Sequence, residues 1–459
     1  MIFNQYYLDC LSHASYLIGD ETTGRAVVVD PRRDVSEYVA DAADADLQIE
    51  LVIETHLHAD FLSGHLELAA LGAEIGYGSA ATTEFESRKL EDGERISLGD
   101  VTLEILHTPG HTPESISIVV REHADDDVPY AVLTGDTLFI GDVGRPDLLV
   151  SAGWSKADLA GMLHDSLHDK LLVLPDATRV YPAHGAGSAC GKNLSTETWS
   201  TIGDQKVTNY AVRLEDRAAF VEAITEGQPT QPAYFAHDAG LNAQERPLLD
   251  VTAPEPMSLA EVEAARAGGA VVVDTRDADT FGRGHLDGSI NAGLDGRYAE
   301  YVGSVVRPDD DIVLVAEPGN ETEAKTRLGR IGFDNVIGAL TDVTAALTGQ
   351  PTSAGVSSRL TAVELDERRS ARRDLQLIDV REAGEVALGT IESSVNVPVG
   401  QLTSRMDELA RDVPTVVFCA GGYRSSLAAS LLRANGFGDV SDLLGGYSAW
   451  AENREAVVS

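Results

Sequence analysis

Basic residues are scarce in this sequence. Its 459 residues include 35 Lys and Arg, only six of them Lys, against 74 Asp and Glu, so the formal net charge is -39 at pH 7. Nucleic acid and anionic membrane both require a positive protein surface, so we expect neither as a partner. We interpret the acidic surface as an adaptation for solvation and solubility, which carries no information about a reaction.

Cysteines and long apolar runs are also scarce. Cys10, Cys190 and Cys419 are the three cysteines of the sequence, too few for a disulfide framework. No stretch approaches the ~18 apolar residues of a membrane span. The first ten residues, MIFNQYYLDC, lack the basic start and apolar run of a signal peptide. The sequence therefore predicts a cytoplasmic protein with free thiols.

Two stretches rich in Pro, Gly, Ser and Thr divide the chain as linkers would. They are VTAPEPMS at 251–258 and TGQPTSAGVSS at 348–358. The chain is long enough for several domains, each with its own core. We therefore expect three domains, at residues 1–250, 251–350 and 351–459.

The last two pieces repeat each other. Residues 271–293 align without a gap on residues 376–398, and residues 311–333 align on residues 414–437. In both copies, short apolar runs such as VVVD and TVVF alternate with segments of helical periodicity. This alternation predicts a doubly wound parallel α/β sheet in each copy. The matched polar residues are Asp274 with Asp379, Arg276 with Arg381, and Asn291 with Asn396.

The first piece has a different pattern, in which short strands each lead into a loop that carries His or Asp. A single histidine is more often structural than a metal ligand. Several such residues directly after apolar strands reverse that expectation and predict a metal site. The residues are His56, His58, Asp60, His111, Asp136 and His184.

This order, H-x-H-x-D and then a His, an Asp and a last His, resembles the metallo-β-lactamase superfamily over about residues 1–250. The resemblance implies an αββα sandwich. In the superfamily's hydrolases, two metals share the bridging Asp, and a His directly after the motif Asp helps to hold the second ion. Here that position is Phe61, so a second ion would keep Asp60, His184 and the shared Asp136 beside an apolar ring. We hypothesise that the ring keeps the site mononuclear.

Two imidazoles and one carboxylate facing open positions are the ligand set of non-haem Fe(II) enzymes that activate O2. The branch of the superfamily that works this way is persulfide dioxygenase. The resemblance implies His56, His111 and Asp136 as the ligands of one Fe(II) per chain. His58, Asp60 and His184 then become outer groups that orient ligands or bound water by hydrogen bonds. Direct ligation by His58, and zinc as the ion, stay open alternatives.

Two further residues are candidates for substrate binding. Arg145, in GRPD, matches a family loop after the Asp ligand and could contact an anionic thiol carrier; a structural salt bridge is the alternative. Cys190, in GSACGKN, follows His184 closely and could hold a persulfide. The alternative for Cys190 is a small buried residue in a Gly-rich turn.

The last piece contains FCAGGYRSSLAASLL, in which an apolar strand leads into the loop Cys419 to Arg424 and then into a helix. A thiolate at a helix N-terminus, ringed by N–H groups and beside a guanidinium, has a lowered pKa and is nucleophilic. With DVRE upstream and GG plus W downstream, the loop resembles that of rhodanese sulfurtransferases. The resemblance implies Cys419 as the nucleophile and Arg424 as an anion clamp. A protein phosphatase loop has one more residue between Cys and Arg.

In the middle copy, the equivalent loop reads VAEPGNE, with Val315 at the place of the cysteine and Asn320 at that of the arginine. This copy therefore lacks a nucleophile and an anion clamp. It resembles the inactive rhodanese half of two-domain sulfurtransferases. We interpret it as a spacer or docking module that positions the active domain.

The order of the three domains resembles the fused persulfide dioxygenase sulfurtransferases of sulfide detoxification. The resemblance implies that O2 oxidises a small-molecule persulfide to sulfite and thiol. Cys419 would pass sulfane sulfur to sulfite, making thiosulfate, or take it from thiosulfate. The direction of transfer, the thiol carrier and the oligomeric state stay open, although domains of this family often pair as homo-oligomers.

Two rival functions use the same features. The first is a dinuclear zinc thioester hydrolase of the glyoxalase type, with the rhodanese as a sulfur carrier. The second is a non-enzymatic sulfur carrier or persulfide sensor, in which Cys419 stores sulfur. The number of bound metal ions and the uptake of O2 with persulfide distinguish these rivals from a persulfide dioxygenase.

Overall fold

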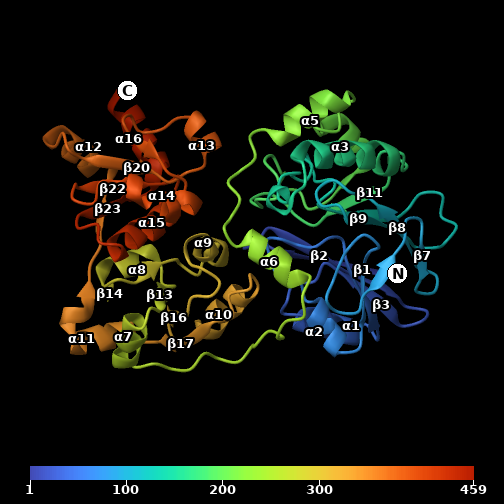
Figure 1. The fold of residues 1–459 in the computed structure, drawn as a ribbon, viewed down its shortest axis with the longest axis horizontal. Coiled ribbons are helices and arrows are strands. Elements are labelled where there is room, and N and C mark those ends of the chain that lie inside the picture. Colours follow the sequence, from blue (N-terminus) through green and yellow to red (C-terminus); the bar gives the residue numbers. More distant parts are fainter. Residues whose placement is uncertain (459) are drawn as a thin grey trace. The chain divides into compact units, whose positions relative to one another are not determined.

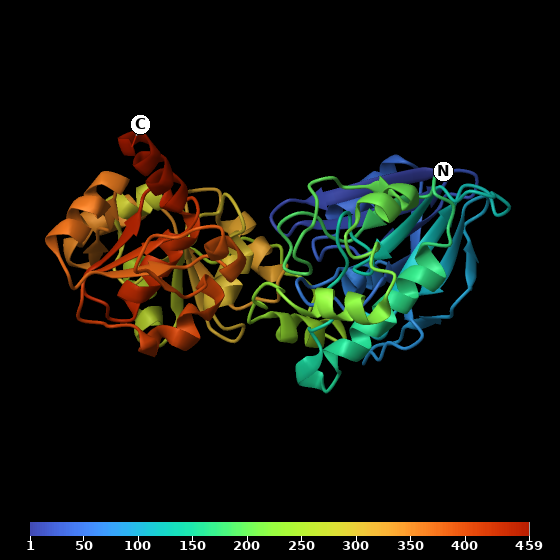
Figure 2. The ribbon, with the colours of Figure 1, turned by 90° about the horizontal axis from the view of Figure 1, so that it is seen from above.

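The computed structural model describes residues 1–458, which form two compact units. The N-terminal unit comprises Met1–Gln231 and Phe235–Leu249, and the C-terminal unit comprises Pro232–Tyr234 and the chain from Asp250 onward. Figures 1 and 2 show the N-terminal unit in blue to light green and the C-terminal unit mainly in yellow to red. Both repeated pieces lie in the C-terminal unit, so the predicted boundary between residues 350 and 351 stays a prediction.

Two mixed sheets form the centre of the N-terminal unit. One has the strand order β1-β2-β3-β4-β5-β6, and the other has the order β12-β11-β10-β9-β8-β7. The first sheet consists of β1 (Ile2–Leu8), β2 (His13–Asp20), β3 (Arg25–Val29), β4 (Gln48–Glu54), β5 (Glu74–Gly78) and β6 (Arg88–Leu90). The second consists of β7 (Arg95–Ser97), β8 (Thr102–His107), β9 (Ile116–Arg121), β10 (Ala131–Gly135), β11 (Arg179–Pro182) and β12 (Ser200–Thr201).

The helices of this unit are α1 (Ser36–Asp44), α2 (His65–Ala70), α3 (Lys156–Ser166), α4 (Ile202–Thr208), α5 (Arg217–Thr225) and α6 (Phe235–Asn242). Alternating side chains on the strands explain why helices cover both outer faces. Val27 and Val29 of β3 pack in the core between the sheets, whereas Val28 packs in a second core with α1 and α2. Val132 of β10 packs in a third core with α3 and α5. The predicted αββα sandwich is confirmed.

Strand directions bring the candidate ligands to one edge of the sandwich. β10 and β11 run parallel, and so do β3 and β4. Parallel neighbours end at the same edge, so Asp136 after β10 lies beside His184 after β11. In the same way, Asp30 after β3 lies beside the residues that follow β4. β8 and β10 are both antiparallel to β9, so the loop that carries His111 also leaves a strand at this edge.

The C-terminal unit contains two parallel sheets with the orders β15-β13-β16-β17 and β19-β23-β22-β20-β21. The first copy comprises α7 (Leu259–Ala267), β13 (Val271–Asp274), α8 (Ala278–Arg283), β14 (His285–Leu286), β15 (Ile290–Asn291), α9 (Tyr298–Val305), β16 (Ile312–Val315), α10 (Glu321–Gly329), β17 (Val336–Leu340) and α11 (Val343–Gly349). β18 (Ala354–Gly355), in the predicted linker, pairs with β14 of this copy.

The second copy comprises β19 (Ser358–Leu360), α12 (Ala362–Ala371), β20 (Gln376–Asp379), α13 (Ala383–Ala387), β21 (Val395–Asn396), α14 (Leu402–Arg405), β22 (Thr415–Phe418), α15 (Tyr423–Ala434), β23 (Val440–Leu443) and α16 (Gly446–Val458). Short turns of 3-10 or π helix occur at Val150–Ala152, Leu167–Leu171, Pro351–Ser353, Val399–Gln401 and Met406–Glu408. Strands and helices alternate in both copies, which confirms the predicted doubly wound α/β class.

The same hydrogen bonds recur in both copies. The Arg two residues after the first buried strand donates to the Asp that ends this strand, and the matched Asn donates to the backbone oxygens of both residues. The residues are Asp274, Arg276 and Asn291 in the first copy and Asp379, Arg381 and Asn396 in the second. The repeat seen in the sequence is therefore a repeat of tertiary contacts.

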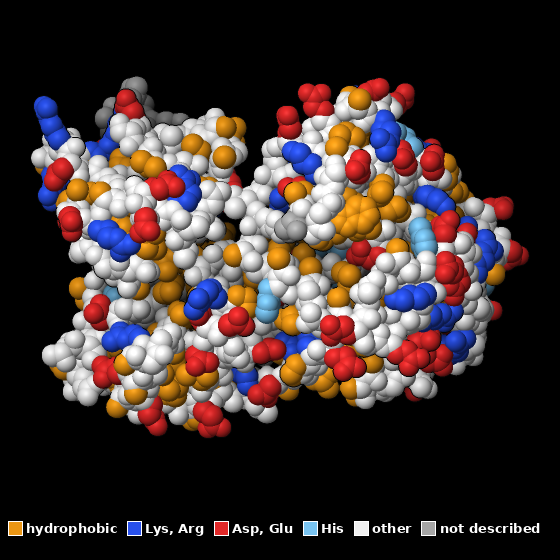
Figure 3. Space-filling view, in the orientation of Figure 1, with side chains coloured by type: hydrophobic (Ala, Val, Ile, Leu, Met, Phe, Trp, Pro, Cys, Tyr) orange, Lys and Arg blue, Asp and Glu red, His pale blue; other side chains and the backbone are white. Residues whose placement is uncertain are grey.

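The surface carries the excess of acidic residues. Figure 3 shows Asp and Glu side chains spread over the visible face of each unit. Across residues 1–458, every helix falls short of the length and apolar character that crossing a bilayer would demand.

Candidate functional site

Three of the predicted metal ligands come together in the N-terminal unit. His56 follows β4, His111 lies between β8 and β9, and Asp136 follows β10. All three side chains are buried, and one ligand atom of each lies within 4.8 Å of the others. Asp136 Oδ2 is 3.4 Å from His111 Nε2 and 3.9 Å from His56 Nε2. These three atoms therefore face one small space.

Hydrogen bonds orient both imidazoles toward that space. His111 Nδ1 lies 2.8 Å from the backbone oxygen of Arg145, which can only accept, so Nδ1 carries the proton and Nε2 keeps its lone pair. His56 Nδ1 lies 3.0 Å from Thr55 Oγ1, and the Thr55 hydroxyl donates to Asp30 Oδ2 at 2.9 Å. Because the Thr55 hydroxyl proton is already donated to Asp30, Thr55 Oγ1 accepts the hydrogen bond from His56 Nδ1. The Nε2 atom of His56 therefore also keeps a lone pair.

Two atoms in this space lack partners. His56 Nε2 and Asp136 Oδ2 are buried and have no hydrogen-bond partner among the described residues. A buried polar atom left in this way costs about 1–3 kcal/mol. A metal ion would satisfy both atoms. Two neutral imidazoles and one carboxylate, with further positions open, fit Fe(II).

The electrostatic environment holds these groups in the forms that bind metal. Burial, reinforced by the neighbouring His58, lowers the pKa of His56 well below its ordinary value. Burial alone would raise the pKa of Asp136, but the surrounding histidines, His184 foremost, lower it well below the usual range. At neutral pH, His56 is therefore a neutral imidazole and Asp136 is a carboxylate.

His58, the second histidine of the motif, is paired with two buried carboxylates. Its Nε2 atom is 3.0 Å from Asp30 Oδ1 and 3.3 Å from Glu54 Oε2. Burial opposes the charged imidazole, but Asp30 and Glu54 outweigh it and raise the pKa of His58 to about 10. A protonated imidazole has no lone pair for a metal, so this geometry favours the outer role over direct ligation. Sequence reasoning missed both carboxylates, although each stands at the end of an apolar run, AVVVD or LVIE.

His184 connects two carboxylates. Its Nδ1 atom is 2.8 Å from Asp136 Oδ1, and its Nε2 atom is 2.7 Å from Asp60 Oδ2. Burial opposes protonation, but Asp136 and Asp60 raise the pKa of His184 well above its ordinary value. The thiol of Cys190 lies beside Asp60 and His184, because one ligand atom of each of these three residues lies within 4.8 Å of the others.

The cysteine loop of the C-terminal unit connects β22 to α15. The Gly422 N–H donates to Cys419 Sγ at 3.1 Å, and the thiol lies 3.6 Å from Ser425 Oγ. Gly422 has a φ of +106°, a conformation that favours glycine. A Cβ atom at Gly446 would lie 2.3 Å from the backbone oxygen of Cys419. The downstream glycine therefore lets the chain close the base of the loop.

Arg424, the last residue of this loop, forms an ion pair. Both of its terminal nitrogens donate to Glu385 of α13, at 2.7 Å each. The two side chains are 16% and 35% exposed, so the pair is partly shielded from solvent. The pair ties the loop to this part of the domain, which makes Arg424 a positioning residue. Its action as an anion clamp stays a prediction.

Family patterns match both units. The metallo-beta-lactamase superfamily matches residues 8–184, and the rhodanese-like domain matches residues 258–341 and 361–453. The mitochondrial persulfide dioxygenase ETHE1 of Bos taurus is 31% identical over 224 residues, covering 47% of this chain and 79% of the relative. The chain belongs to the metallo-beta-lactamase superfamily. Its C-terminal unit adds two rhodanese-like domains.

Two further comparisons extend this assignment. A cytoplasmic hydroxyacylglutathione hydrolase of Arabidopsis thaliana is 33% identical over 183 residues, covering 39% of this chain and 66% of that protein. A crystal structure of a metallo-beta-lactamase from Staphylococcus aureus matches with 33% identity and a TM-score of 0.69, covering 74% of this chain and 99% of that one. The fusion of a metallo-beta-lactamase domain with two rhodanese-like domains is confirmed, and the chain is an enzyme.

The first rhodanese-like domain has Ala316 at the place of the cysteine. Val315 and Phe418 occupy the same place in the two sheets, each opposite the Asp that ends the first buried strand. Cys419 follows Phe418, so its counterpart is Ala316, and the placement of Val315 there was wrong by one residue. Alanine also lacks a thiol, so this domain still has no nucleophile in its loop.

The same domain contacts the cysteine loop of the second. The Tyr423 hydroxyl donates to the backbone oxygen of Gly293, and the Ser426 hydroxyl donates to Asn291 Oδ1 at 2.6 Å. The ring of Tyr301, on α9, lies 5.5 Å from that of Tyr423. The first rhodanese-like domain therefore contacts the cysteine loop directly, and its interpretation as a spacer or docking module stays a prediction.

The side chain of Arg145, in the metallo-beta-lactamase domain, forms hydrogen bonds with other residues of the protein. Two of its nitrogens donate to Asp147 at 2.7 and 2.9 Å, and the third donates to the backbone oxygen of Ala189 at 2.9 Å. Its side chain is 3% exposed. This geometry favours the salt-bridge alternative over the predicted contact with a thiol carrier. The Arg145 backbone N–H also donates to Cys190 O at 3.0 Å, so Arg145 holds the Cys190 loop in place.

His13, at the start of β2, is a site residue that sequence reasoning missed. Its ring lies 4.0 Å from the Phe61 ring and 5.7 Å from the His184 ring. The side chain is fully buried, and neither ring nitrogen has a hydrogen-bond partner among the described residues. A single His in SHASYLIG has no spacing that relates it to the metal motif, so the sequence carries little signal for it.

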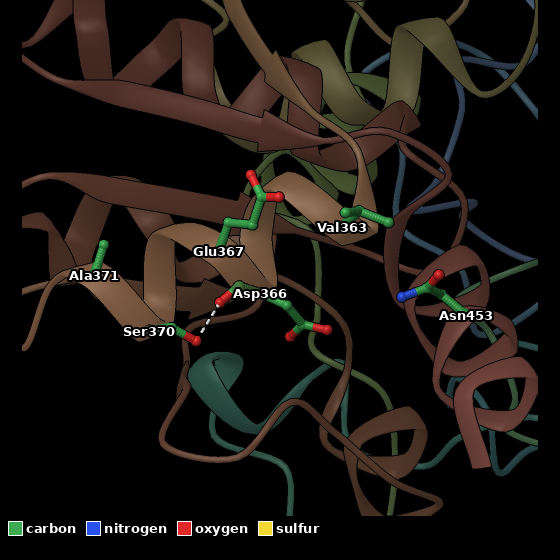
Figure 4. A pocket seen from close by; sticks show the side chains of 6 residues that line it. All are labelled: Val363, Asp366, Glu367, Ser370, Ala371 and Asn453. Carbon is green, nitrogen blue, oxygen red and sulfur yellow. Dashed lines mark hydrogen bonds between the residues drawn. The ribbon is translucent and has the colours of Figure 1, made fainter.

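A surface pocket of about 620 Å³ lies between α12 and α16 of the second rhodanese-like domain (Figure 4). It contains none of the candidate ligands and no part of the cysteine loop. Two acidic side chains in its lining disfavour anionic sulfur compounds, so we assign it no part in the chemistry. The lining residues are Val363, Asp366, Glu367, Ser370, Ala371 and Asn453.

Proposed function

We propose that this enzyme uses O2 to oxidise the persulfide of a small thiol, and that its cysteine loop transfers sulfane sulfur. The balanced oxidation is RSSH + O2 + H2O → RSH + SO3²⁻ + 2 H⁺. The observation that carries the proposal is the buried group of His56, His111 and Asp136. His58 does not belong to this group, because it is paired with Asp30 and Glu54. The likeness to persulfide dioxygenase ETHE1 of Bos taurus supports the same reaction.

In this proposal, His56, His111 and Asp136 hold one Fe(II), which when bound supplies the activation of O2. The remaining residues prepare the site. Thr55 and the backbone oxygen of Arg145 fix the tautomers of the two imidazoles. His184 holds the Asp136 carboxylate at 2.8 Å, and Asp60 holds His184 in turn. Burial of these groups keeps bulk water from the oxidised sulfur.

The sulfur-transfer step uses Cys419. Its thiolate attacks the outer sulfur of RSSH, the S–S bond breaks, and RSH leaves with the persulfide proton. Sulfite then attacks the outer sulfur of the cysteine persulfide, which yields thiosulfate and restores the thiolate. The Gly422 N–H at 3.1 Å from Sγ and the N-terminus of α15 stabilise the anionic sulfur. The reverse direction, from thiosulfate to a thiol, uses the same groups.

The cellular setting follows from this chemistry. Removal of persulfides as sulfite and thiosulfate is a step of sulfide detoxification. Cys10, Cys190 and Cys419 are all free thiols, as expected in a reducing compartment. We therefore propose the cytoplasm as the location.

A second candidate is a dinuclear zinc thioester hydrolase. The likeness to the Arabidopsis hydroxyacylglutathione hydrolase favours it. The ligand set of such a hydrolase is incomplete in this chain, however. Phe61 stands where the superfamily's hydrolases have a ligand, and His58 is bound to Asp30 and Glu54. The persulfide dioxygenase therefore accounts for more of the site.

Metal analysis of anaerobically purified protein, combined with O2 consumption on a panel of small-molecule persulfides, tests the proposal. We expect one iron per chain and O2 uptake that releases sulfite. Two zinc ions per chain, hydrolysis of an acyl-thiol and no O2 uptake would establish the hydrolase instead.

A further inference from the structure

Tyr423 belongs to the cysteine loop, but its side chain lies against the first rhodanese-like domain. Its hydroxyl donates to the backbone oxygen of Gly293, and its ring lies 5.5 Å from that of Tyr301. We propose that Tyr423 is a positioning residue, through which the first domain holds the loop in the shape that stabilises the Cys419 thiolate. This inference rests on the proposed function of Cys419 as a nucleophile, and it adds a part of the sulfur-transfer site that lies in the other domain.

Two glycines of the first domain make room for the Tyr423 ring. A Cβ atom at Gly296 would lie 3.3 Å from Tyr423 Cε2, and a Cβ atom at Gly293 would lie 3.6 Å from the same atom. Arg327 of α10 donates to the backbone oxygens of Leu294 and Gly296, so the segment around these glycines is fixed within its own domain. The ring therefore packs against a surface that the first domain has already shaped.

Two buried hydrogen bonds continue this contact along α15. The Ser426 hydroxyl donates to Asn291 Oδ1 at 2.6 Å, and the Asn291 N–H donates to Ser430 Oγ at 2.9 Å. All three residues are buried. Ser426 and Ser430 are four residues apart, so they lie on the same face of the helix. The first domain therefore holds the first turns of α15, the helix whose N-terminus follows the cysteine loop.

Both neighbours of Tyr423 in the chain act on the sulfur-transfer site. The Gly422 N–H donates to Cys419 Sγ at 3.1 Å, and Arg424 is paired with Glu385. Glycine has the widest choice of backbone conformations, so an anchor at the next residue keeps the Gly422 N–H directed at the sulfur. An N–H group stabilises a thiolate best when it does not have to reorient. The domain without a nucleophile therefore contributes to the reactivity of Cys419.

The hydroxyl of Tyr423 keeps its proton at neutral pH. Burial raises the pKa of the Tyr423 phenol, although the neighbouring Arg327 guanidinium opposes the shift. The hydroxyl therefore donates to the backbone oxygen of Gly293, which can only accept. Phenylalanine at this position keeps the ring and removes this hydrogen bond alone. Tyr423→Phe is therefore the variant that isolates the contact between the loop and the first domain.

The test is the rate at which iodoacetamide alkylates Cys419 in the full-length protein, followed by mass spectrometry of the peptide that carries this cysteine. At pH 7, Tyr423→Phe should react roughly two- to tenfold more slowly than the wild type, the range that one hydrogen bond supports. At pH 10, where an ordinary thiol is ionised, the two rates should converge. Tyr298→Phe is the matched control, because the Tyr298 hydroxyl is buried in the first domain without a hydrogen-bond partner among the described residues. Its Cys419 should react at the wild-type rate.

A second variant changes the first domain alone. Arg327→Met removes the hydrogen bonds that fix the segment against Tyr423, so it should also slow the alkylation of Cys419 at pH 7. Sulfur transfer from thiosulfate to a thiol should show the same factor in kcat, with KM little changed. Wild-type alkylation rates in Tyr423→Phe, or an equal slowing at pH 7 and pH 10, would overturn the proposal. Slowed alkylation in the variants of a protein that transfers no sulfur would support the positioning role and refute the proposed sulfur transfer.

Discussion

The Phe61→His variant should turn a buried apolar contact into a metal ligand. The Phe61 ring is fully buried, 4.0 Å from His13 and 4.4 Å from His58. An imidazole there, without metal, leaves a buried polar nitrogen unsatisfied and costs about 1–3 kcal/mol. For a unit of this size, a loss of about 2 kcal/mol lowers the melting temperature by roughly 4–8 °C.

Zinc should reverse this loss. Binding to the folded state adds about 2.7 kcal/mol of stability at a zinc concentration 100 times Kd. The assay is thermal unfolding with excess chelator and with zinc, together with metal analysis of both samples. With chelator, the variant should melt below the wild type; with zinc, its melting temperature should rise by more than that of the wild type.

Phe61→Leu is the matched control, because it keeps the position apolar and adds no ligand. Zinc should shift the melting temperature of Phe61→Leu no more than that of the wild type. The reasoning is refuted if Phe61→His binds the same amount of metal as the wild type and zinc stabilises both equally. That result would mean that the ring does not govern the occupancy of the second position.

Three further predictions concern the C-terminal unit. Cys419→Ser should abolish formation of thiosulfate while O2 uptake with persulfide continues; loss of both activities would show that the loop serves the oxidation as well. Glu385→Gln removes the charged partner of Arg424, so we expect a loss of about 1–3 kcal/mol and slower sulfur transfer, measured by urea unfolding and thiosulfate assay. Unchanged transfer would remove the positioning role of Arg424. Burial lowers the pKa of His285 to about 4, from about 6.5 in the unfolded chain, so its contribution to stability is present above pH 6.5 and is lost as the pH falls toward 4. Urea unfolding between pH 7 and pH 4.5 should show this loss in the wild type and not in His285→Gln.

The ligand motif and the repeat could be read from the sequence because they depend on local order. The H-x-H-x-D spacing follows one strand, and each later ligand follows a strand of its own. The Asp, Arg and Asn of the two rhodanese-like copies recur at the same spacing, and their hydrogen bonds recur with them. The place of the cysteine in the inactive copy was wrong by one residue, because sequence alignment does not include the register of the sheet.

The roles of the polar residues around the ligands could not be read in this way. Asp30 lies 26 residues before His56 in the chain, yet parallel pairing of β3 with β4 places it against His58 and Thr55. For Arg145, the sequence left a substrate contact and a structural salt bridge open, and the hydrogen bonds to Asp147 and Ala189 in the folded chain favour the salt bridge. A sequence shows which residues can donate or accept a hydrogen bond, and folding decides which partners they find.

The sequence by itself determined the class of each domain, the metal motif, the cysteine loop and the absence of a nucleophile from the middle copy. These depend on residue types at short spacing and on apolar periodicity, which act locally along the chain. Tertiary structure alone decided that His58 is charged by its carboxylates, that Arg424 is tied to Glu385, and that Cys190 joins Asp60 and His184. Charge state and partnership depend on burial and on distances of a few ångströms between distant segments, and only the folded chain sets them.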